Sequence, residues 1–122
     1  MEEIFDLVDA NDEIIGKTTR LAAHGNPSLI HRVAHVLVFN SRGQLFLQKR
    51  SLTKRIQPGR WDTSVGGHLD SGEDYLSAAV RETEEELGIT APAGSFVFLY
   101  KYLHRNEIES EYVSTYRLLY DG

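Results

Sequence analysis

Residues 66–89 constrain the fold more than any other part of the chain. They are predicted to form a glycine-rich loop that leads into an amphipathic helix. Ser71 is the expected N-cap, with Asp74 three residues later in a capping-box-like pair. Gly88 stands where a left-handed C-cap is needed, so the helix is expected to end there. The expected buried stripe consists of apolar or small residues at helical spacing: Leu76, Val80, Thr83 and Leu87.

Three glutamates crowd the other side of this helix. Glu82, Glu85 and Glu86 follow the i, i+3, i+4 spacing that places side chains on one face, about 5–6 Å apart. At an effective dielectric constant of 20, two such charges repel each other by roughly 3 kcal/mol. A divalent cation turns this repulsion into attraction, and ligands made only of oxygen favour Mg²⁺ or Mn²⁺ over zinc. The simpler interpretation is a solvated acidic face, and the cluster alone does not separate the two.

The positions around the cluster resemble the Nudix box, G-x5-E-x7-R-E-U-x-E-E-x-G-U, in which U is a bulky aliphatic residue. The matching residues are Gly67, Glu73, Arg81, Glu82, Glu85, Glu86, Gly88 and Ile89. One position departs from the pattern, because the smaller and more polar Thr83 stands at the first U. The resemblance implies one Nudix hydrolase domain over residues 1–122, with an α/β/α sandwich built on a mixed β-sheet.

The same resemblance implies the chemistry: hydrolysis of a diphosphate bond in a nucleoside diphosphate linked to another moiety, with Mg²⁺ or Mn²⁺ as the cofactor. The expected metal ligands are the carboxylates of Glu82, Glu85 and Glu86 and a backbone carbonyl at Gly66 or Gly67.

Two further roles belong to this expected catalytic set. Arg81 is expected to orient the carboxylates by contacting Glu73 or Glu85. The proton acceptor is expected to be Glu85 or a late carboxylate, Glu109 or Glu111.

A second likeness, from about residue 5 to residue 117, is to type 1 isopentenyl-diphosphate isomerases. The residues that match the metal ligands of that family are His24, His31, His68, Glu109 and Glu111, which implies a second metal site. Arg50 and Lys54 fall where that family contacts diphosphate, so they are the expected substrate-binding residues, and Trp61 also matches. The simpler interpretations are structural histidines at loop or strand ends and solubilising charges. His35 and His104 are expected to be ordinary.

The chain departs from the isomerases in two respects. It contains no cysteine, so their catalytic thiol is missing, and it keeps the helix carboxylates that they lack. An isomerase-like subgroup of Nudix hydrolases agrees with both observations. The alternatives are a retained isomerase activity and a non-catalytic nucleotide-binding module.

Charge and composition limit the partners. The net charge is −5, yet five of the 13 basic residues lie within residues 49–60. A cationic loop in an acidic chain suits a small anionic ligand better than a nucleic acid polymer. No apolar run is long enough for a membrane span, and the acidic N-terminus does not resemble a signal peptide, so a cytoplasmic location is expected.

The remaining sequence predicts strands on both sides of the helix. The expected strands are residues 4–8, 14–17, 32–39, 44–50, 61–65, 96–103 and 111–120, with one helical turn at 19–24. The chain stops directly after the last strand, so the further strand and helix usual in Nudix domains are expected to be missing. The sheet face left uncovered would invite a partner, and a homodimer is one option.

Overall fold

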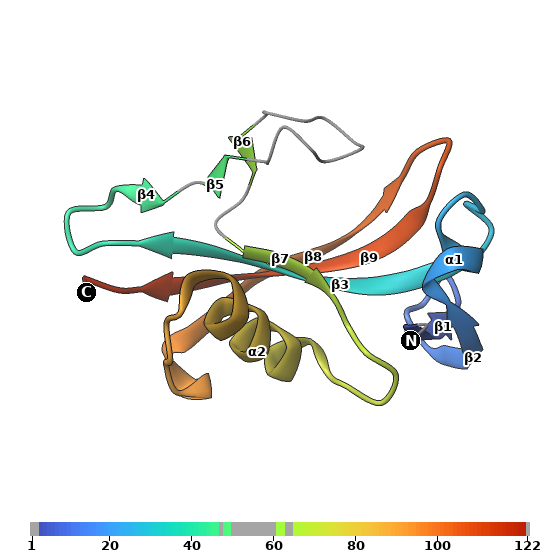
Figure 1. Ribbon diagram of the computed structural model, residues 1–122, viewed down its shortest axis with the longest axis horizontal. Coiled ribbons are helices and arrows are strands. Elements are labelled where there is room, and N and C mark those ends of the chain that lie inside the picture. The colour runs from blue at the N-terminus through green and yellow to red at the C-terminus, as the bar shows by residue number, and fades with distance from the viewer. Residues whose placement is uncertain (1–2, 47, 50–60, 63–64, 122) are drawn as a thin grey trace.

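The computed structural model describes residues 3–46, 48–49, 61–62 and 65–121, which form a twisted β-sheet with one long helix packed on it (Figure 1). The strands are β1 (Ile4–Val8), β2 (Ile14–Thr19), β3 (Ile30–Phe39), β4 (Leu45–Phe46), β5 (Gln48–Lys49), β6 (Trp61–Asp62), β7 (Val65–His68), β8 (Phe96–Arg105) and β9 (Ser110–Leu119). The helices are α1 (Arg20–Ala23) and α2 (Tyr75–Leu87), with a 3₁₀ turn at Ala93–Ser95.

The main sheet is mixed, as predicted. Its strand order is β2-β1-β3-β9-β8, and β4 and β7 also pair with β3. β3 runs parallel to β9 over ten residue pairs, from Ile30↔Ser110 to Phe39↔Leu119, and antiparallel to β1, β4 and β7. The predicted hairpin of the last two strands is confirmed as the antiparallel pair β8–β9.

The two faces of β3 have different surroundings. Ala34, Val36 and Val38 are buried in the core cluster that includes Ala78 and Ala79 of α2. Because side chains alternate along a strand, His31, Val33 and His35 point to the opposite face. We call this opposite face the histidine face. The nearly apolar strand predicted for this segment is therefore confirmed, and the histidines mark the face that does not carry α2.

Helix α2 ends as predicted but begins differently. Gly88 adopts the left-handed conformation at φ 70°, and its N–H donates to the Glu84 carbonyl. The N-cap is Asp74, whose carboxylate accepts from the Ser77 N–H at 2.7 Å, so the assignment of Ser71 as N-cap was wrong. Ser71 instead donates to Asp6 at 2.8 Å, in the loop before the helix.

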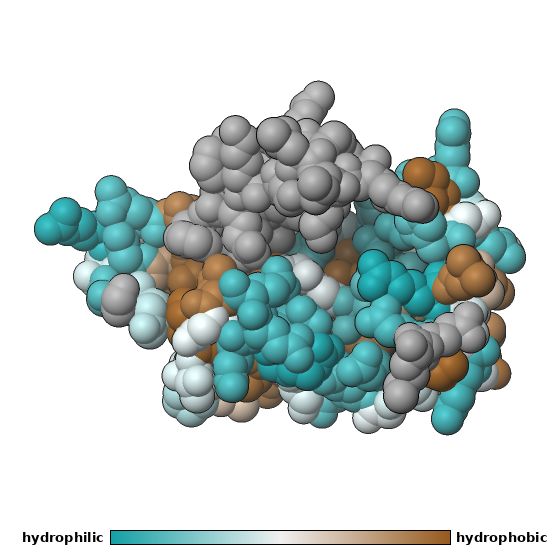
Figure 2. Space-filling view, viewed as in Figure 1, coloured by the Kyte–Doolittle hydropathy of each residue, from teal (hydrophilic) through white to brown (hydrophobic). Residues whose placement is uncertain are grey.

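The inner side of α2 is made of smaller residues than predicted. Ala78, Ala79 and Thr83 are its buried residues, while Leu76, Val80 and Leu87 are partly buried and pack against the core cluster. The Thr83 hydroxyl donates to the Ala79 carbonyl at 2.7 Å, which satisfies the polar group at the position where a bulky aliphatic residue was expected. The outward surface of α2 is hydrophilic (Figure 2).

Two predicted strands are each divided in the structure. Residues 44–50 contribute β4, which pairs with β3, and β5, which pairs with β6 in a separate two-stranded sheet. Residues 61–65 likewise contribute β6 and the first residue of β7. The predicted helical turn is confirmed as α1, capped by the Thr19 hydroxyl. No helix in the described ranges has both the length and the hydropathy to cross a membrane.

Asp12 fastens the β1–β2 turn to the side of the sheet that carries α2. Its carboxylate accepts from Arg32 Nε at 2.9 Å, from the Tyr75 hydroxyl at 2.8 Å and from Lys101 Nζ at 2.8 Å. Its backbone has φ 61°, which only a few non-glycine residues adopt, Asp and Asn most readily. These hydrogen bonds outweigh the effect of burial and lower the pKa of Asp12.

Candidate active site

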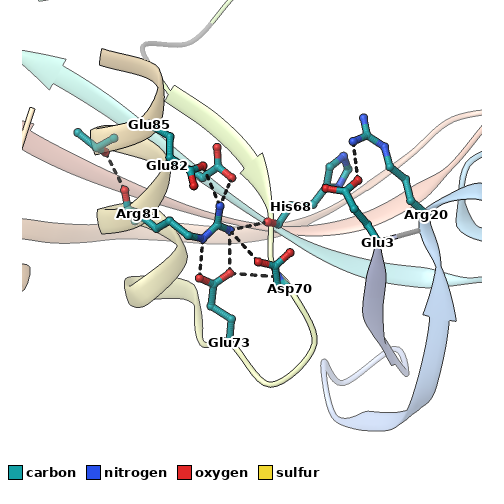
Figure 3. Close-up of polar contacts among 10 residues, drawn as sticks. Glu3, Arg20, His68, Asp70, Glu73, Arg81, Glu82 and Glu85 are labelled. Carbon is teal, nitrogen blue, oxygen red and sulfur yellow. Dashed lines mark hydrogen bonds and ion pairs between the residues drawn. The ribbon is translucent and has the colours of Figure 1, made fainter. Parts of the chain in front are cut away.

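Arg81 lies at the centre of the carboxylates that the sequence singled out (Figure 3). Its guanidinium donates two bonds to Glu73, both at 2.8 Å, one to Glu82 at 2.6 Å and one to Glu85 at 3.1 Å. A further bond of 3.1 Å reaches the backbone carbonyl of His68. The predicted contacts with Glu73 and Glu85 are thus both present. The guanidinium of Arg81 thus links Glu82 and Glu85 of the helix to Glu73 of the loop and to strand β7.

These contacts favour the charged forms. The hydrogen bond from Arg81 lowers the pKa of Glu73, and the same bond raises the pKa of Arg81 further above its ordinary value. Charge-assisted bidentate pairs are among the stronger hydrogen bonds in proteins. The loop is therefore held to the helix by an ion pair that persists at any physiological pH.

Gly67 allows α2 to approach strand β7 closely; residues 66–68, predicted to belong to a loop, are part of this strand. An ideal Cβ at this residue would lie 2.3 Å from Glu82 Cδ and 2.6 Å from each carboxylate oxygen of Glu82. No side chain fits in that space, so the Glu82 carboxylate, which is 15% exposed, lies against the backbone of β7. The arrangement puts a carboxylate beside backbone groups of Gly67, as expected for a metal site made of oxygen ligands.

A second cluster lies on the histidine face. His31, on β3, and Glu111, on β9, are partners in the strand register, and His68 comes from β7. Their ligand atoms all lie within 4.8 Å of one another, and His31 Nε2 is 3.2 Å from Glu111 Oε2. Phe5 of β1 stacks on both histidine rings, with centroid distances of 5.4 and 4.9 Å. Four strands and one aromatic ring therefore hold the cluster together.

The buried nitrogens of this cluster are not satisfied within the part of the chain that the structure describes. His31 Nδ1 and Nε2 and His68 Nδ1 are buried without a hydrogen-bond partner, since the 3.2 Å approach to Glu111 lacks hydrogen-bond geometry. Unpaired buried polar atoms are costly, and a bound cation would satisfy them. Two imidazoles and a carboxylate also suit a divalent transition metal. The residues thus fit such an ion.

Burial controls the protonation of the cluster. Burial lowers the pKa of His68 from 6.5 to about 4, and the nearby His31 lowers it as well. Burial alone would raise the pKa of Glu111, but its contact with His31 and the charges of the surrounding histidines outweigh burial and lower it. Near neutral pH the cluster therefore offers a neutral imidazole and an ionised carboxylate, the forms that bind metal.

His24 and Glu109 form a separate pair rather than joining the three clustered ligands. His24 Nδ1 lies 3.4 Å from Glu109 Oε2, and His24 is more than half exposed. The pair is held near the cluster because Gly25 donates to the Ile108 carbonyl at 2.8 Å. The five residues predicted for a second metal site thus fall into a group of three and a group of two.

One cavity of about 650 Å³ connects both clusters and the pair. Its lining includes Glu82 and Glu86 from α2, Gly66 and Gly67 from β7, His31, His68 and Glu111 from the cluster, and His24 and Glu109 from the pair. Because α2 and the histidine face lie on opposite sides of the sheet, the cavity must pass around strand β7. Glu82, Glu86 and the histidines therefore face the same space from two directions, whereas Glu85 is not among the lining residues.

Sequence reasoning missed four residues that line this cavity. His35 and His104 were expected to be ordinary, and the pair Glu3–Arg20, 2.7 Å apart, was not considered. His35 lies four residues after His31 on one strand, so the two-residue period already placed both on one face. His104 is the strand partner of Glu111, which only the hairpin register reveals. Arg50 and Lys54, the predicted substrate-binding residues, lie outside the described residues.

Comparison with known proteins identifies the family of this chain. The NUDIX domain family matches residues 29–121. The chain is 42% identical over 87 residues to an isopentenyl-diphosphate Delta-isomerase of Streptomyces avermitilis, covering 71% of this chain and 44% of that protein. It is 39% identical over 102 residues to an uncharacterized Nudix hydrolase of Streptomyces coelicolor, covering 83% of this chain and 56% of that protein.

A solved structure supports the same fold. The crystal structure of DR0079 from Deinococcus radiodurans matches with a TM-score of 0.82 and 32% identity, covering 98% of this chain and 74% of that one. The two curated proteins named above are longer, and this chain spans about half of their length.

Proposed function

The chain belongs to the Nudix family, and on this premise we propose that it is a divalent-metal-dependent hydrolase that cleaves a diphosphate bond in a nucleoside diphosphate linked to another moiety. The observation that carries the proposal is the shared cavity, in which Glu82 and Glu86 of α2 and the His31–His68–Glu111 cluster face one space. A diphosphate bound between two metal-binding groups is well placed for attack by water. The cavity has room for a small anionic substrate, and because the charged residues in its lining are mostly acidic, bound cations are needed to hold that substrate.

The helix site would hold Mg²⁺ or Mn²⁺ through Glu82, Glu85, Glu86 and the backbone carbonyl of Gly67. A cation bound there supplies charge for the phosphoryl oxygens and lowers the pKa of its water. Arg81 keeps Glu82 and Glu85 in place through the bonds of 2.6 and 3.1 Å. His31, His68 and Glu111 would hold a second divalent ion, and His24 and Glu109 would contribute to it if the pair closes toward the cluster.

Proton transfer needs a carboxylate within reach of the attacking water. Glu85 is 58% exposed and held at one oxygen by Arg81, so it is available to accept a proton. Glu111 and Glu109, unlike Glu85, are among the residues that line the cavity and are the alternative acceptors. Arg50 and Lys54 are proposed to neutralise the diphosphate, since phosphoryl transfer depends mainly on positioning and electrostatics.

The test is a panel of diphosphate compounds incubated with Mg²⁺ or Mn²⁺, with the products followed by ³¹P NMR. Glu85→Gln and Glu86→Gln should each lower turnover by roughly 100-fold or more, because each removes charge from the metal site. Glu84→Gln is the matched control, since Glu84 is an exposed neighbour on α2 that is not one of the proposed metal ligands. Unchanged turnover in both Glu85→Gln and Glu86→Gln would exclude the helix site. If the wild-type protein hydrolysed no compound of the panel, the hydrolase function would be excluded.

Isopentenyl-diphosphate isomerase activity is the second candidate, because relatives of that name are 42% identical over 87 residues. The absence of cysteine from the 122 residues argues against it, since allylic isomerisation needs a proton donor as well as an acceptor. Proton NMR of isopentenyl diphosphate separates the two activities. Dimethylallyl diphosphate formed without phosphate release would favour the isomerase.

A further inference from the structure

Two tyrosines of β8 lie on the histidine face beside the cavity. Tyr102 pairs with Val113 and Tyr100 with Thr115 in the β8–β9 register, and His104 pairs with Glu111. Paired residues of neighbouring strands point to the same side of a sheet, and residues two apart on one strand do so as well. Tyr100, Tyr102 and His104 therefore share one face with Glu111.

The two rings form an exposed aromatic surface. Tyr100 is 50% exposed and Tyr102 43%, and their ring centroids lie 6.0 Å apart at an interplanar angle of 43°. By contrast, Tyr116 on the neighbouring strand is 8% exposed, and the Tyr75 hydroxyl is bound to Asp12 on the other face. Neither ring belongs to the core cluster, so both are available for contact with a ligand.

The tyrosines continue directly from the proposed reaction site. His104 and Glu111 both line the cavity. A strand advances about 7 Å for every two residues, so Tyr102 lies about 7 Å and Tyr100 about 14 Å along β8 from His104. A nucleoside diphosphate places a flat ring one sugar away from its phosphates. A diphosphate in the cavity thus puts its base within reach of these rings.

We propose that Tyr100 and Tyr102 form a stacking surface for the nucleobase of the substrate. The proposal rests on the proposed diphosphate hydrolase function and specifies which moiety the site selects. Aromatic side chains stack on any base through their π-faces, and tyrosine adds a polar edge that tolerates water. A branched aliphatic chain, as in an isoprenoid diphosphate, would gain little from two tilted, half-exposed phenols compared with an enclosed aliphatic pocket.

The experiment compares substrates with and without a base. Tyr100→Leu and Tyr102→Leu should lower kcat/KM for ADP-ribose by roughly 5- to 100-fold. The same variants should leave hydrolysis of methyl diphosphate and geranyl diphosphate unchanged, and Tyr100→Phe and Tyr102→Phe should retain wild-type activity. Phe98→Leu is the matched control, because Phe98 is 55% exposed on the same strand but pairs with Tyr116 on the other face.

A binding measurement separates this proposal from the proposed function. Adenine protons of AMP should shift upfield in wild-type protein and not in Tyr100→Leu, whether or not any diphosphate is hydrolysed. If the leucine variants lost kcat/KM equally for ADP-ribose and geranyl diphosphate, the stacking surface would be overturned while the hydrolase function would stand. So would a wild-type dimer that Tyr100→Leu converts to a monomer in sedimentation, since the rings would then cover a second copy of the chain.

Discussion

Replacing Gly67 by alanine should misplace a proposed metal ligand while leaving the rest of the chain unaffected. The new Cβ would lie 2.3 Å from Glu82 Cδ, and ordinary van der Waals contact begins at 3.4 Å. The Glu82 carboxylate must therefore retreat by about 1 Å, against its 2.6 Å bond to Arg81. A displacement of about 1 Å at a reacting centre can lower the rate by about 100-fold. Overpacking of this kind costs about 1–3 kcal/mol of stability.

The assay has three readouts: turnover of a responsive diphosphate compound, Mn²⁺ affinity by titration, and the free energy of unfolding in urea. Gly94→Ala is the matched control, because a Cβ at Gly94 meets nothing within 4 Å. We expect turnover and Mn²⁺ affinity to fall together in Gly67→Ala and to be unchanged in Gly94→Ala.

A double-mutant cycle identifies the cause. If the clash with the Glu82 carboxylate is responsible, Gly67→Ala should cost less stability in a Glu82→Ala background, with a coupling of about 1 kcal/mol or more. Wild-type turnover and Mn²⁺ affinity in Gly67→Ala would refute the reasoning, because Glu82 would then not need its place beside β7.

Three further predictions concern charge. Arg81→Lys should lower turnover by roughly 10- to 100-fold and weaken Mn²⁺ binding in titration, because lysine cannot reproduce the bidentate bond to Glu73; wild-type values in both measurements would contradict this. In metal-free protein, the unfolded chain takes up a proton at His68 below pH 6.5, whereas the folded chain, with a pKa of about 4, does not. Urea unfolding should therefore show full stability above pH 6.5 and a loss of about 2 kcal/mol by pH 5, and a His68→Gln variant with an equally steep loss would rule out this assignment. Asp12→Asn keeps the tolerance for φ 61° but leaves Arg32 and Lys101 without their counterion, so chemical denaturation should show a loss of about 2–3 kcal/mol; a loss below about 0.5 kcal/mol would show that Asp12 is not an anchor.

Local patterns in the sequence were sufficient to predict helix α2, its C-terminal end and the carboxylates that it carries. Helical periodicity and a glycine in the left-handed region located α2 and its end at Gly88, since both signals depend on neighbouring residues alone. The start of α2 was misjudged because Ser71 and Asp74 both suit an N-cap, and only the tertiary bond from Ser71 to Asp6 decides between them. The division of residues 44–50 into β4 and β5 also depends on pairing with distant strands.

The histidine cluster shows what a sequence cannot specify alone. The likeness to isomerases named His31, His68 and Glu111 but also His24 and Glu109, and the structure separates the three residues on strands from the two that lie outside strands. Phe5, which stacks on both clustered histidines, carried no signal, because an aromatic residue in a short strand looks like ordinary core. The parallel pairing of β3 with β9 joins residues 80 positions apart, and no local pattern predicts such a contact.

The ladder between β3 and β9 limits how this protein can change over evolutionary time. An extra residue inserted in the middle of either strand would turn the side chains after it to the other face, so Val36 and Tyr116 would no longer point the same way. Insertions in the turns between strands carry no such penalty. Lineages that descend from this chain are therefore free to lengthen their turns, while these two strands must keep a constant residue count.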